Sequence, residues 1–382
     1  MRVCDVVINS IWFDPRVRRQ INSYLENGIE LSCVGYKCSR YNLDKVNDIP
    51  CDTTIVEVEN KYTGPQKGIF RKLRREYLID SAISNAIVHY KPDIIHANDL
   101  NALIPSYLAA KKLGCKLIYD SHEIYVENYT SKHDNFTAKV FKFVEKFLVH
   151  RIDLMVCVSN SAAEYFEEEY KIKRPLVVTN CAMKKDCCIK ELNKEKSAYF
   201  EVLNHGQFYE GRGYDIMVDA LPLISKVPQI RFALRGFGKM EGQLHRAVEK
   251  CENISQFCFY PPVNVEELIP LASHSNVGVA ITVPICLNFK LSVSNKLFEY
   301  AAAGLPVIMS DIPEHRILNE KYNFGIILSE NTPEDFADAV ISLYYDKEKY
   351  SILSQNSINM SRTLNWENEF MKLIELEKRI LN

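Results

Sequence analysis

The sequence contains no run of 18 apolar residues, so it lacks a segment long enough to cross a bilayer as a helix. It also lacks the paired Cys-x-x-Cys motifs that hold a structural zinc ion. Neither sign of charge is in large excess, because the formal net charge is only −2. A nucleic-acid-binding surface over the whole molecule is therefore not expected.

The start of the chain and its cysteines indicate the compartment. The opening stretch MRVCDVVINS reads as a strand and has none of the regions of a secretory leader. Twelve cysteines would be many for a secreted enzyme, and Cys4, Cys33 and Cys157 fall in apolar runs, where a thiol packs as a small hydrophobe. We therefore expect free thiols and a cytoplasmic protein.

Length and composition point to two domains. At 382 residues the chain exceeds the roughly 250 to 300 residues at which a single core stops growing. Its content of 47% hydrophobic and 25% charged residues is the balance of a folded globular protein.

The first half alternates apolar strand runs with amphipathic helices. One helix is predicted to begin with Asp14 as N-cap and Pro15 in its first turn and to end at Gly28, and another is predicted to end at Gly114. Strands are predicted in RVCDVVIN, ELSCVGY, DIIHAND, KLIYDSHE, DLMVCVSN and PLVVTN. Nearly continuous apolar strands separated by helices predict an α/β fold with a parallel sheet covered on both faces.

The same pattern restarts after a polar segment, residues 183–195. Further strands are predicted in YFEVLNHG, IRFALRG, QFCFYP, VGVAIT and FGIILSE, with helices from Tyr214, Lys239 and Val265. We expect two doubly wound, Rossmann-like domains, residues 1–182 and 196–365, joined by the linker 183–195, and a last helix at 366–382 that crosses back to the first domain. Ligands of such sheets bind beyond the carboxyl ends of the strands, and two such domains face to face form a central cleft.

Two turns of the second half carry candidate anion-binding residues. Arg212 and Gly213 stand just ahead of the helix from Tyr214, where backbone N–H groups and a guanidinium would meet a phosphate. Gly236 and Gly238 lie in LRGFGK, which lacks the third glycine of a dinucleotide-binding fingerprint. Taken alone, the arginine could be a solvated loop residue and the glycines a tight turn.

A glutamate inside a short apolar helix is informative. In SVSNKLFEYAAAGLPVIMSD, Glu299 shares a helix face with Asn295, one turn from a start that Ser294 is predicted to cap. Free N–H groups at residues 295–297 would favour an anion there, and the carboxylate suits the vicinal hydroxyls of a ribose. The alternative is a surface glutamate favoured by the helix dipole.

The motifs together resemble a known family. DPRVRRQINSYLENG, DIIHANDLNALIPSYLAAKKLGCKLIYDSHE, GQFYEGRGYD, LRGFGK and SNKLFEYAAAGLPVIMSDIPE stand in the order and at the spacing of glycosyltransferase family 4, the retaining nucleotide-sugar transferases of the GT-B fold. The resemblance covers nearly the whole chain. It implies an N-terminal acceptor domain, a C-terminal donor domain and no metal or other cofactor, because backbone amides and basic side chains neutralise the diphosphate.

The resemblance also implies roles for single residues. Glu299 matches the ribose-binding glutamate, Arg212 the diphosphate-binding residue, and His122 in YDSHE the histidine that touches the donor sugar, for which a structural histidine is the alternative. The remaining residues expected on the donor side are Gly206, Gln207, Gly236, Gly238, Val263, Asn288, Ser294, Asn295 and Lys296, and those on the acceptor side are Asp14, Arg16, Asp99 and Glu123.

Two positions depart from the family pattern. Gln207 stands where a second basic residue is common, which puts part of the diphosphate clamp in doubt, and Leu291 stands where many members carry a glutamate. Asn288 is a candidate substitute, although asparagine in a loop often only forms a turn. The missing carboxylate suggests a donor sugar with less polar surface at that edge, such as a deoxy or acylated amino sugar.

The expected activity is retaining transfer of a sugar from UDP or GDP to the hydroxyl of a lipid-linked acceptor in cell-surface polysaccharide synthesis. Basic residues interleaved with apolar ones at 61–80 predict peripheral contact with an anionic membrane surface, with a solvated helix as the alternative. These basic residues are Lys67, Arg71, Lys72, Arg74 and Arg75. Two other functions stay open: a nucleotide-sugar epimerase of the same fold, and a non-catalytic partner of another transferase.

Overall fold

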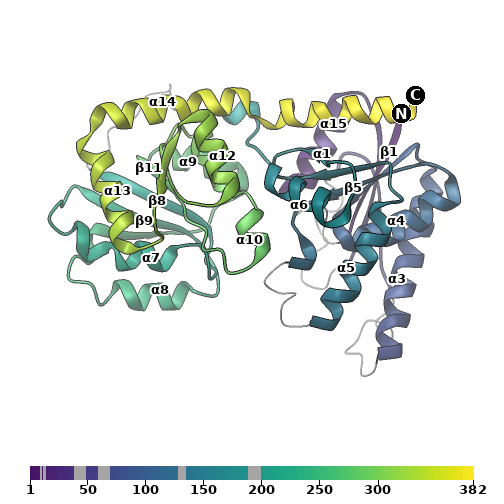
Figure 1. The fold of residues 1–382 in the computed structure, drawn as a ribbon, viewed down its shortest axis with the longest axis horizontal. Helices are drawn as coiled ribbons and strands as arrows, with labels where there is room; N and C mark the ends of the chain where they lie inside the picture. The colour runs from purple at the N-terminus through teal and green to yellow at the C-terminus, as the bar shows by residue number, and fades with distance from the viewer. Residues whose placement is uncertain (9–10, 12–13, 38–48, 59–68, 128–134, 188–198) are drawn as a thin grey trace. The chain divides into compact units, whose positions relative to one another are not determined.

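The computed structural model describes residues 1–8, 11, 14–37, 49–58, 69–127, 135–187 and 199–382. Two compact units divide the chain, Met1–Thr179 with Phe370–Asn382 and Asn180–Glu369. Each unit contains one parallel sheet with helices on both faces (Figure 1). Of the expected linker, only 183–187 lies within the described residues, and it carries a short 3-10 turn at Lys184–Asp186.

The first sheet has seven strands in the order β3-β2-β1-β4-β5-β6-β7. Its main elements are β1 (Arg2–Val7), α1 (Pro15–Glu26), β2 (Glu30–Tyr36), β3 (Asp52–Val56), α3 (Ile69–Tyr90), β4 (Ile94–Asn98), α4 (Asp99–Leu113), β5 (Lys116–Ser121), α5 (Asn135–Val149), β6 (Leu154–Cys157), α6 (Asn160–Tyr170) and β7 (Leu176–Val177). Every neighbouring pair of strands is parallel. The sequence pattern did not predict β3, because DTTIV is short and half polar.

The predicted start and end signals of the first helix are confirmed. Asp14 Oδ1 accepts hydrogen bonds from the backbone N–H groups of Arg16 and Val17, and Pro15 occupies the first helical position. Gly28 follows the helix with a left-handed φ of 68°, a conformation that glycine adopts without steric cost.

The second sheet has six parallel strands in the order β10-β9-β8-β11-β12-β13. Its main elements are β8 (Phe200–Gln207), α7 (Tyr214–Asp219), β9 (Ile230–Phe237), α8 (Glu241–Val248), β10 (Phe257–Tyr260), α9 (Val265–Ala272), β11 (Val277–Ala280), α10 (Leu287–Leu291), α11 (Asn295–Ala302), β12 (Val307–Ser310), α12 (Pro313–Tyr322), β13 (Gly325–Leu328), α13 (Pro333–Tyr345) and α14 (Lys347–Thr363). The helix predicted from Lys239 begins two residues later, at Glu241.

The last helix, α15 (Trp366–Leu381), contributes to both units, since the division of the chain falls after Glu369. In the first unit its Phe370 ring packs edge to face on Tyr24, with centroids 4.9 Å apart. Both rings are buried, so this part of the helix belongs to the core of the first unit.

Candidate functional site

Polar side chains gather at the carboxyl edge of the first sheet, where the strand order reverses between β1 and β4. Asn98 ends β4, Asp99 begins α4, and His122 directly follows β5. Doubly wound sheets bind ligands at such switch points. The sequence predicted functional roles for Asp99 and His122, and the structure brings the two into contact.

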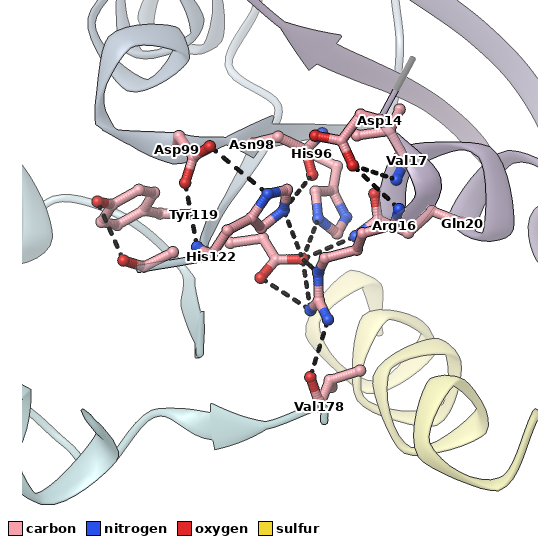
Figure 2. Close-up of polar contacts among 12 residues, drawn as sticks. Asp14, Arg16, Val17, Gln20, His96, Asn98, Asp99, Tyr119, His122 and Val178 are labelled. Carbon is pink, nitrogen blue, oxygen red and sulfur yellow. Dashed lines mark hydrogen bonds and ion pairs between the residues drawn. The ribbon is translucent and has the colours of Figure 1, made fainter. Parts of the chain in front are cut away.

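His122 is held on both sides of its ring (Figure 2). Nε2 lies 3.1 Å from Asn98 Oδ1, and Nδ1 lies 3.5 Å from Asp99 Oδ2. The backbone N–H of His122 donates to Asp99 Oδ1 at 3.1 Å. Asp99 has a left-handed backbone with φ 64°, which aspartate tolerates better than most residues. In this conformation its carboxylate contacts both the ring and the backbone of His122.

A buried ion pair lies next to His122. Asp120 Oδ2 is 3.7 Å from His122 Nε2 and 2.8 Å from Arg16 Nη2. Arg16 Nε also donates to Asp120 at 3.1 Å, and its Nη1 donates to the Val178 carbonyl at 3.0 Å. The two charged side chains are 3% and 0% exposed, so this bidentate pair is shielded from water.

This geometry does not support the acceptor-side role expected for Arg16. Its guanidinium is buried and bound to Asp120 and Val178, so it has little surface to offer a substrate. Burial alone would raise the pKa of Asp120, but the charges of Arg16 and His122 outweigh it and hold the pKa of that carboxyl well below its usual range. We assign Arg16 to the support of Asp120.

The same carboxylates set the charge of His122. Burial disfavours a charged ring, yet Asp99 and Asp120 raise the pKa of His122 to about 9. The Asn98 amide nitrogen donates to the Val6 carbonyl and to Asp5, which leaves Oδ1 to accept from His122 Nε2. At neutral pH the ring is therefore an imidazolium, which can donate hydrogen bonds but cannot act as a general base.

Two other acceptor-side predictions have structural contacts. Asp14 caps α1, as described above. Glu123 follows His122, is partly exposed, and its carbonyl accepts a hydrogen bond from Ser121 Oγ at 2.7 Å. An acceptor role for either residue stays a prediction.

A second group of candidate residues lies at the carboxyl end of β8 in the second unit. Lys296 Nζ donates to Asn204 Oδ1 at 2.7 Å and lies 3.3 Å from the Tyr214 hydroxyl. Burial and the charge of Arg212 lower the pKa of Lys296 to about 7, and Glu299 offsets them only in part. An anion bound here would favour the charged form of the lysine.

Glu299 faces the same end of β8. Its Oε2 accepts a hydrogen bond from His205 Nε2 at 2.7 Å, and the backbone N–H of His205 donates to the Tyr300 hydroxyl at 2.9 Å. The Glu299 side chain is 23% exposed, whereas His205 is 1% exposed. The carboxylate is thus anchored to a buried histidine and still reaches solvent, as a ribose contact requires.

Arg212 lies between Gly211 and Gly213, both at positive φ, directly before α7. Its guanidinium lies 4.7 Å from the centre of the Phe289 ring. A Cβ on Gly213 would come within 2.4 Å of Ile281, so the glycine permits close approach of this turn. Anion binding at this turn, which precedes the six-residue helix α7, stays a prediction.

The predicted glycines of β8 and β9 have a packing explanation. Gly206 pairs with Gly236, and a Cβ on Gly236 would lie 1.8 Å from the Gly206 carbonyl oxygen. A Cβ on Gly238 would lie 2.5 Å from the Phe208 carbonyl oxygen. Close backbone approach accounts for Gly236 and Gly238, and a positive φ of 124° accounts for Gly206. Contact of these glycines with a ligand stays a prediction.

The start of α11 differs from the expectation. Ser294 is at the N-cap position, but its hydroxyl makes no capping hydrogen bond. The N–H of Leu297 was expected to be free, and this is wrong, because it donates to the Ser294 carbonyl at 3.1 Å in a tightened first turn. Of the other donor-side predictions, Asn288 is buried in α10, Val263 is partly buried before α9, and Gln207 and Asn295 are exposed.

Sequence reasoning missed several polar residues of both groups. They are Asp120 and His96 in the first unit and Asn204, His205 and Tyr214 in the second. Four of the five interrupt apolar strands near their carboxyl ends, in KLIYDSHE, DIIHAND and YFEVLNHG. A buried polar side chain is costly unless it has a partner, so these interruptions were the available signal.

The predicted membrane-contacting residues are described only in part. Lys67 lies outside the described residues, and of Arg71 and Lys72 only the helical backbone of α3 is described. Arg74 is exposed, and Arg75 Nη1 lies 3.8 Å from Glu76. Within the described part of the chain, no helix is long and apolar enough to cross a membrane.

Models of two sequence families match most of the chain. Residues 17–183 match the model described as Glycosyltransferase Family 4, and residues 200–346 match the one described as Glycosyl transferases group 1. The chain belongs to the family 4 glycosyltransferases. This confirms the resemblance found in the sequence.

One curated protein is similar to this family 4 glycosyltransferase over two thirds of its length. It is the O-antigen biosynthesis glycosyltransferase WbnH of Escherichia coli, 26% identical over 269 residues, which are 67% of this chain and 71% of the relative.

Solved structures confirm the GT-B type of fold, with its two parallel-sheet Rossmann-like units. Sucrose-phosphate synthase from Thermosynechococcus elongatus has a TM-score of 0.78 at 16% identity, over 99% of this chain and 98% of that one. HepE from Anabaena, in complex with UDP and glucose, has a TM-score of 0.75 at 15% identity, over 99% of this chain and 100% of that one. At these identities the likeness establishes the fold alone.

Proposed function

We propose that this glycosyltransferase moves a sugar from a nucleoside diphosphate sugar to an acceptor hydroxyl in the synthesis of a cell-surface polysaccharide. The observation that carries the proposal is the group of Arg212, Lys296 and Glu299 in the second unit. Lys296 Nζ lies 2.7 Å from Asn204 Oδ1 at the end of β8, where burial and the charge of Arg212 lower its pKa and the charge of Glu299 raises it. The relatives support it, since HepE was solved with UDP-glucose and WbnH is named for O-antigen biosynthesis.

UDP is the first donor nucleotide to test, and GDP the second. Two basic side chains match the charge of a diphosphate, and the Glu299 carboxylate can accept hydrogen bonds from ribose hydroxyls. We propose that Arg212 and Lys296 neutralise the diphosphate without a metal ion. Turnover should then persist in excess EDTA, and a loss restored by Mg²⁺ or Mn²⁺ would contradict this part of the proposal.

The proposed transfer retains the configuration of the sugar. The acceptor oxygen bonds to the anomeric carbon on the face from which the diphosphate oxygen leaves. The electron pair of the broken bond stays on the departing phosphate, which also takes the proton of the acceptor hydroxyl. Arg212 and Lys296 would stabilise the charge that develops on this leaving group.

The donor sugar is proposed to be a deoxy or acylated amino sugar. The side chain of Leu291, at the end of α10, cannot accept a hydrogen bond, and Asn288 of the same helix is buried. A buried hydroxyl without a partner costs about 1 to 3 kcal/mol. Initial rates with UDP- and GDP-linked hexoses, N-acetylhexosamines and 6-deoxyhexoses test this. Preference for glucose, galactose or mannose that survives Asn288→Ala would contradict it.

The acceptor is proposed to be lipid-linked, with the enzyme in peripheral contact with an anionic membrane surface. Arg74 is exposed on α3. On α5, Phe143 and Phe147 are 72% and 47% exposed, and Lys146 is also exposed. Basic side chains and exposed aromatic rings suit a surface of anionic headgroups.

One assay separates the transferase from the two other functions. The purified chain is incubated with a donor panel, with and without a lipid-linked acceptor, and both released nucleotide and sugar product are measured. Acceptor-dependent release of nucleoside diphosphate with a retained anomer is expected. Change of the donor sugar without acceptor would indicate an epimerase, and no reaction with any donor and acceptor would indicate a non-catalytic partner.

A further inference from the structure

A series of buried polar side chains connects His122 to the C-terminal helix α15. Asp120 Oδ2 lies 3.7 Å from His122 Nε2 and 3.4 Å from His96 Nε2. On its other side, His96 Nδ1 lies 2.9 Å from the Tyr24 hydroxyl, which lies 2.5 Å from Glu377 Oε1. Asp120, His96, Tyr24 and Glu377 are fully buried, and all belong to the first unit.

Hydrogen-bond direction leaves two arrangements for this series. An ionised Asp120 can only accept, so His96 Nε2 carries a proton. If the Tyr24 hydroxyl donates its hydrogen bond to Glu377, its oxygen accepts a hydrogen bond from the N–H at His96 Nδ1. Both ring nitrogens of His96 then carry protons, and His96 is an imidazolium. If Glu377 is instead protonated and donates to Tyr24, then Tyr24 donates to a neutral His96.

The charges around His96 favour the imidazolium. The groups that face it are Asp5 on β1, Arg16 and Tyr24 on α1, Asp120 at the end of β5 with His122 beyond it, and Glu377 on α15. Three carboxylates against the guanidinium of Arg16 and the imidazolium of His122 leave a surplus of one negative charge in a buried region. Although burial disfavours its charge, the carboxylates of Asp120, Glu377 and Asp5 raise the pKa of His96 to about 10.

We infer that Glu377 is a positioning residue. Its carboxylate, 3.8 Å from His96 Nδ1 and bridged to it by the Tyr24 hydroxyl, keeps His96 charged, and the charged His96 helps Arg16 to hold Asp120 beside His122. The C-terminal helix would thereby fix a residue of the candidate site that it does not touch. Neutralising Glu377 should release the proton on His96 Nδ1 and weaken the bond between His96 and Asp120, because a charge-assisted hydrogen bond is about twice as strong as a neutral one.

Nuclear magnetic resonance of ¹⁵N-histidine-labelled protein tests the charge state without an activity assay. The signals of His96 are those absent from a His96→Gln variant. In the wild type we expect both ring nitrogens of His96 to carry slowly exchanging protons at about pH 8, more than a unit above the ordinary histidine pKa. A single ring proton on His96 at that pH would overturn the inference. Only the wild type and the His96→Gln variant used for assignment have to fold for this measurement.

Two variants separate charge from packing. Glu377→Gln keeps the shape of the side chain and should lower the pKa of His96 by about one unit or more. Tyr24→Phe removes the hydroxyl but keeps the carboxylate, so His96 should stay charged while its Nδ1 proton exchanges faster. The matched control is Glu375→Gln, which changes an exposed glutamate on the same helix. An unchanged pKa of His96 in Glu377→Gln would overturn the inference.

The activity test rests on the proposed function, whereas the resonance test does not. If the chain is a transferase, Glu377→Gln should lower kcat increasingly as the pH rises through the reduced pKa of His96, with activity at lower pH kept and Glu375→Gln unaffected. A uniform loss at every pH would instead show a structural role and contradict positioning. If the resonance spectra show the expected charge of His96 and its expected change in Glu377→Gln, but the chain transfers no sugar, the proposed function is refuted and the inference stands.

Discussion

Glu299 accepts a 2.7 Å hydrogen bond from Nε2 of the buried His205, so its carboxylate is fixed at the end of β8. If Glu299 binds the donor ribose, Glu299→Gln should weaken UDP binding by about tenfold or more, the value of one hydrogen bond to a charged group. Titration calorimetry should show that affinity for inorganic pyrophosphate is kept, because pyrophosphate has no ribose. Equal weakening for both ligands would refute the ribose contact, and Glu320→Gln, an exposed change in the same unit, is the control.

Arg212→Ala should reduce kcat by about tenfold to a hundredfold, because a charge-assisted phosphate contact is worth roughly 1.5 to 3 kcal/mol. The melting temperature should stay close to that of the wild type, since the side chain is partly exposed at the surface of the second unit. Arg246→Ala, which removes an exposed arginine from α8, should leave both quantities unchanged. Near wild-type turnover of Arg212→Ala would remove Arg212 from the site.

Lys296→Met should make the folded protein more stable while abolishing donor binding. The pKa of Lys296 is lowered to about 7 from its ordinary 10.5, so between these values the unfolded chain binds more protons and stability rises with pH. Burying the charge therefore costs stability at neutral pH, and methionine removes that cost. Chemical denaturation at about pH 7 and about pH 10 should show the gain mainly at the lower pH. A loss of stability, or a gain equal to that of the exposed Lys290→Met control, would contradict this.

Asp99→Asn should shift the titration of His122 downward. The Asp99 carboxylate is the largest influence that raises the pKa of His122, to about 9. A raised histidine pKa adds stability that is complete below the ordinary value of 6.5 and is lost as the pH rises through the folded value. In Asp99→Asn this loss should begin at a lower pH, as measured by melting temperature against pH.

Asparagine is the matched replacement at this position because it tolerates the left-handed backbone at φ 64°. Asp99→Ala should lose about 1 to 2 kcal/mol more from backbone strain. An unchanged pH profile in Asp99→Asn would show that Asp99 does not set the charge of His122.

Removing Arg74 and Arg75 together should weaken binding to anionic vesicles. Each basic residue near such a surface is worth about 1 kcal/mol, or roughly fivefold in affinity. Vesicle sedimentation should show the loss at low salt and little binding of either protein at high salt. The paired control, Lys111→Ala with Lys112→Ala, removes two exposed charges from α4. Equal affinity of the wild type for neutral and anionic vesicles would count against membrane contact.

Features that depend on local sequence pattern could be predicted from the sequence. Apolar periodicity predicted most strands of both sheets, and the spacing of Ser294, Asn295 and Glu299 predicted which face of α11 carries the carboxylate. It could not predict that Arg16 pairs with Asp120, because these residues are 104 positions apart and only strand order brings them together. The bond between His205 and Glu299 was missed for the same reason, with 94 positions between them.

The backbone N–H of Leu297 shows a second limit of prediction from sequence. Whether the first N–H groups of a helix are free depends on how tightly its first turn winds, and a shift from i→i−4 to i→i−3 bonding is not encoded in residue type.

The most direct test of a nucleotide-sugar site in the second unit is calorimetric titration of the wild-type protein and of Arg212→Ala with UDP and GDP. One of the two nucleotides should bind the wild type with a stoichiometry of about one, and the variant should bind it at least about tenfold more weakly. If neither nucleotide binds, or if both proteins bind it equally well, the assignment of this site to the donor is wrong.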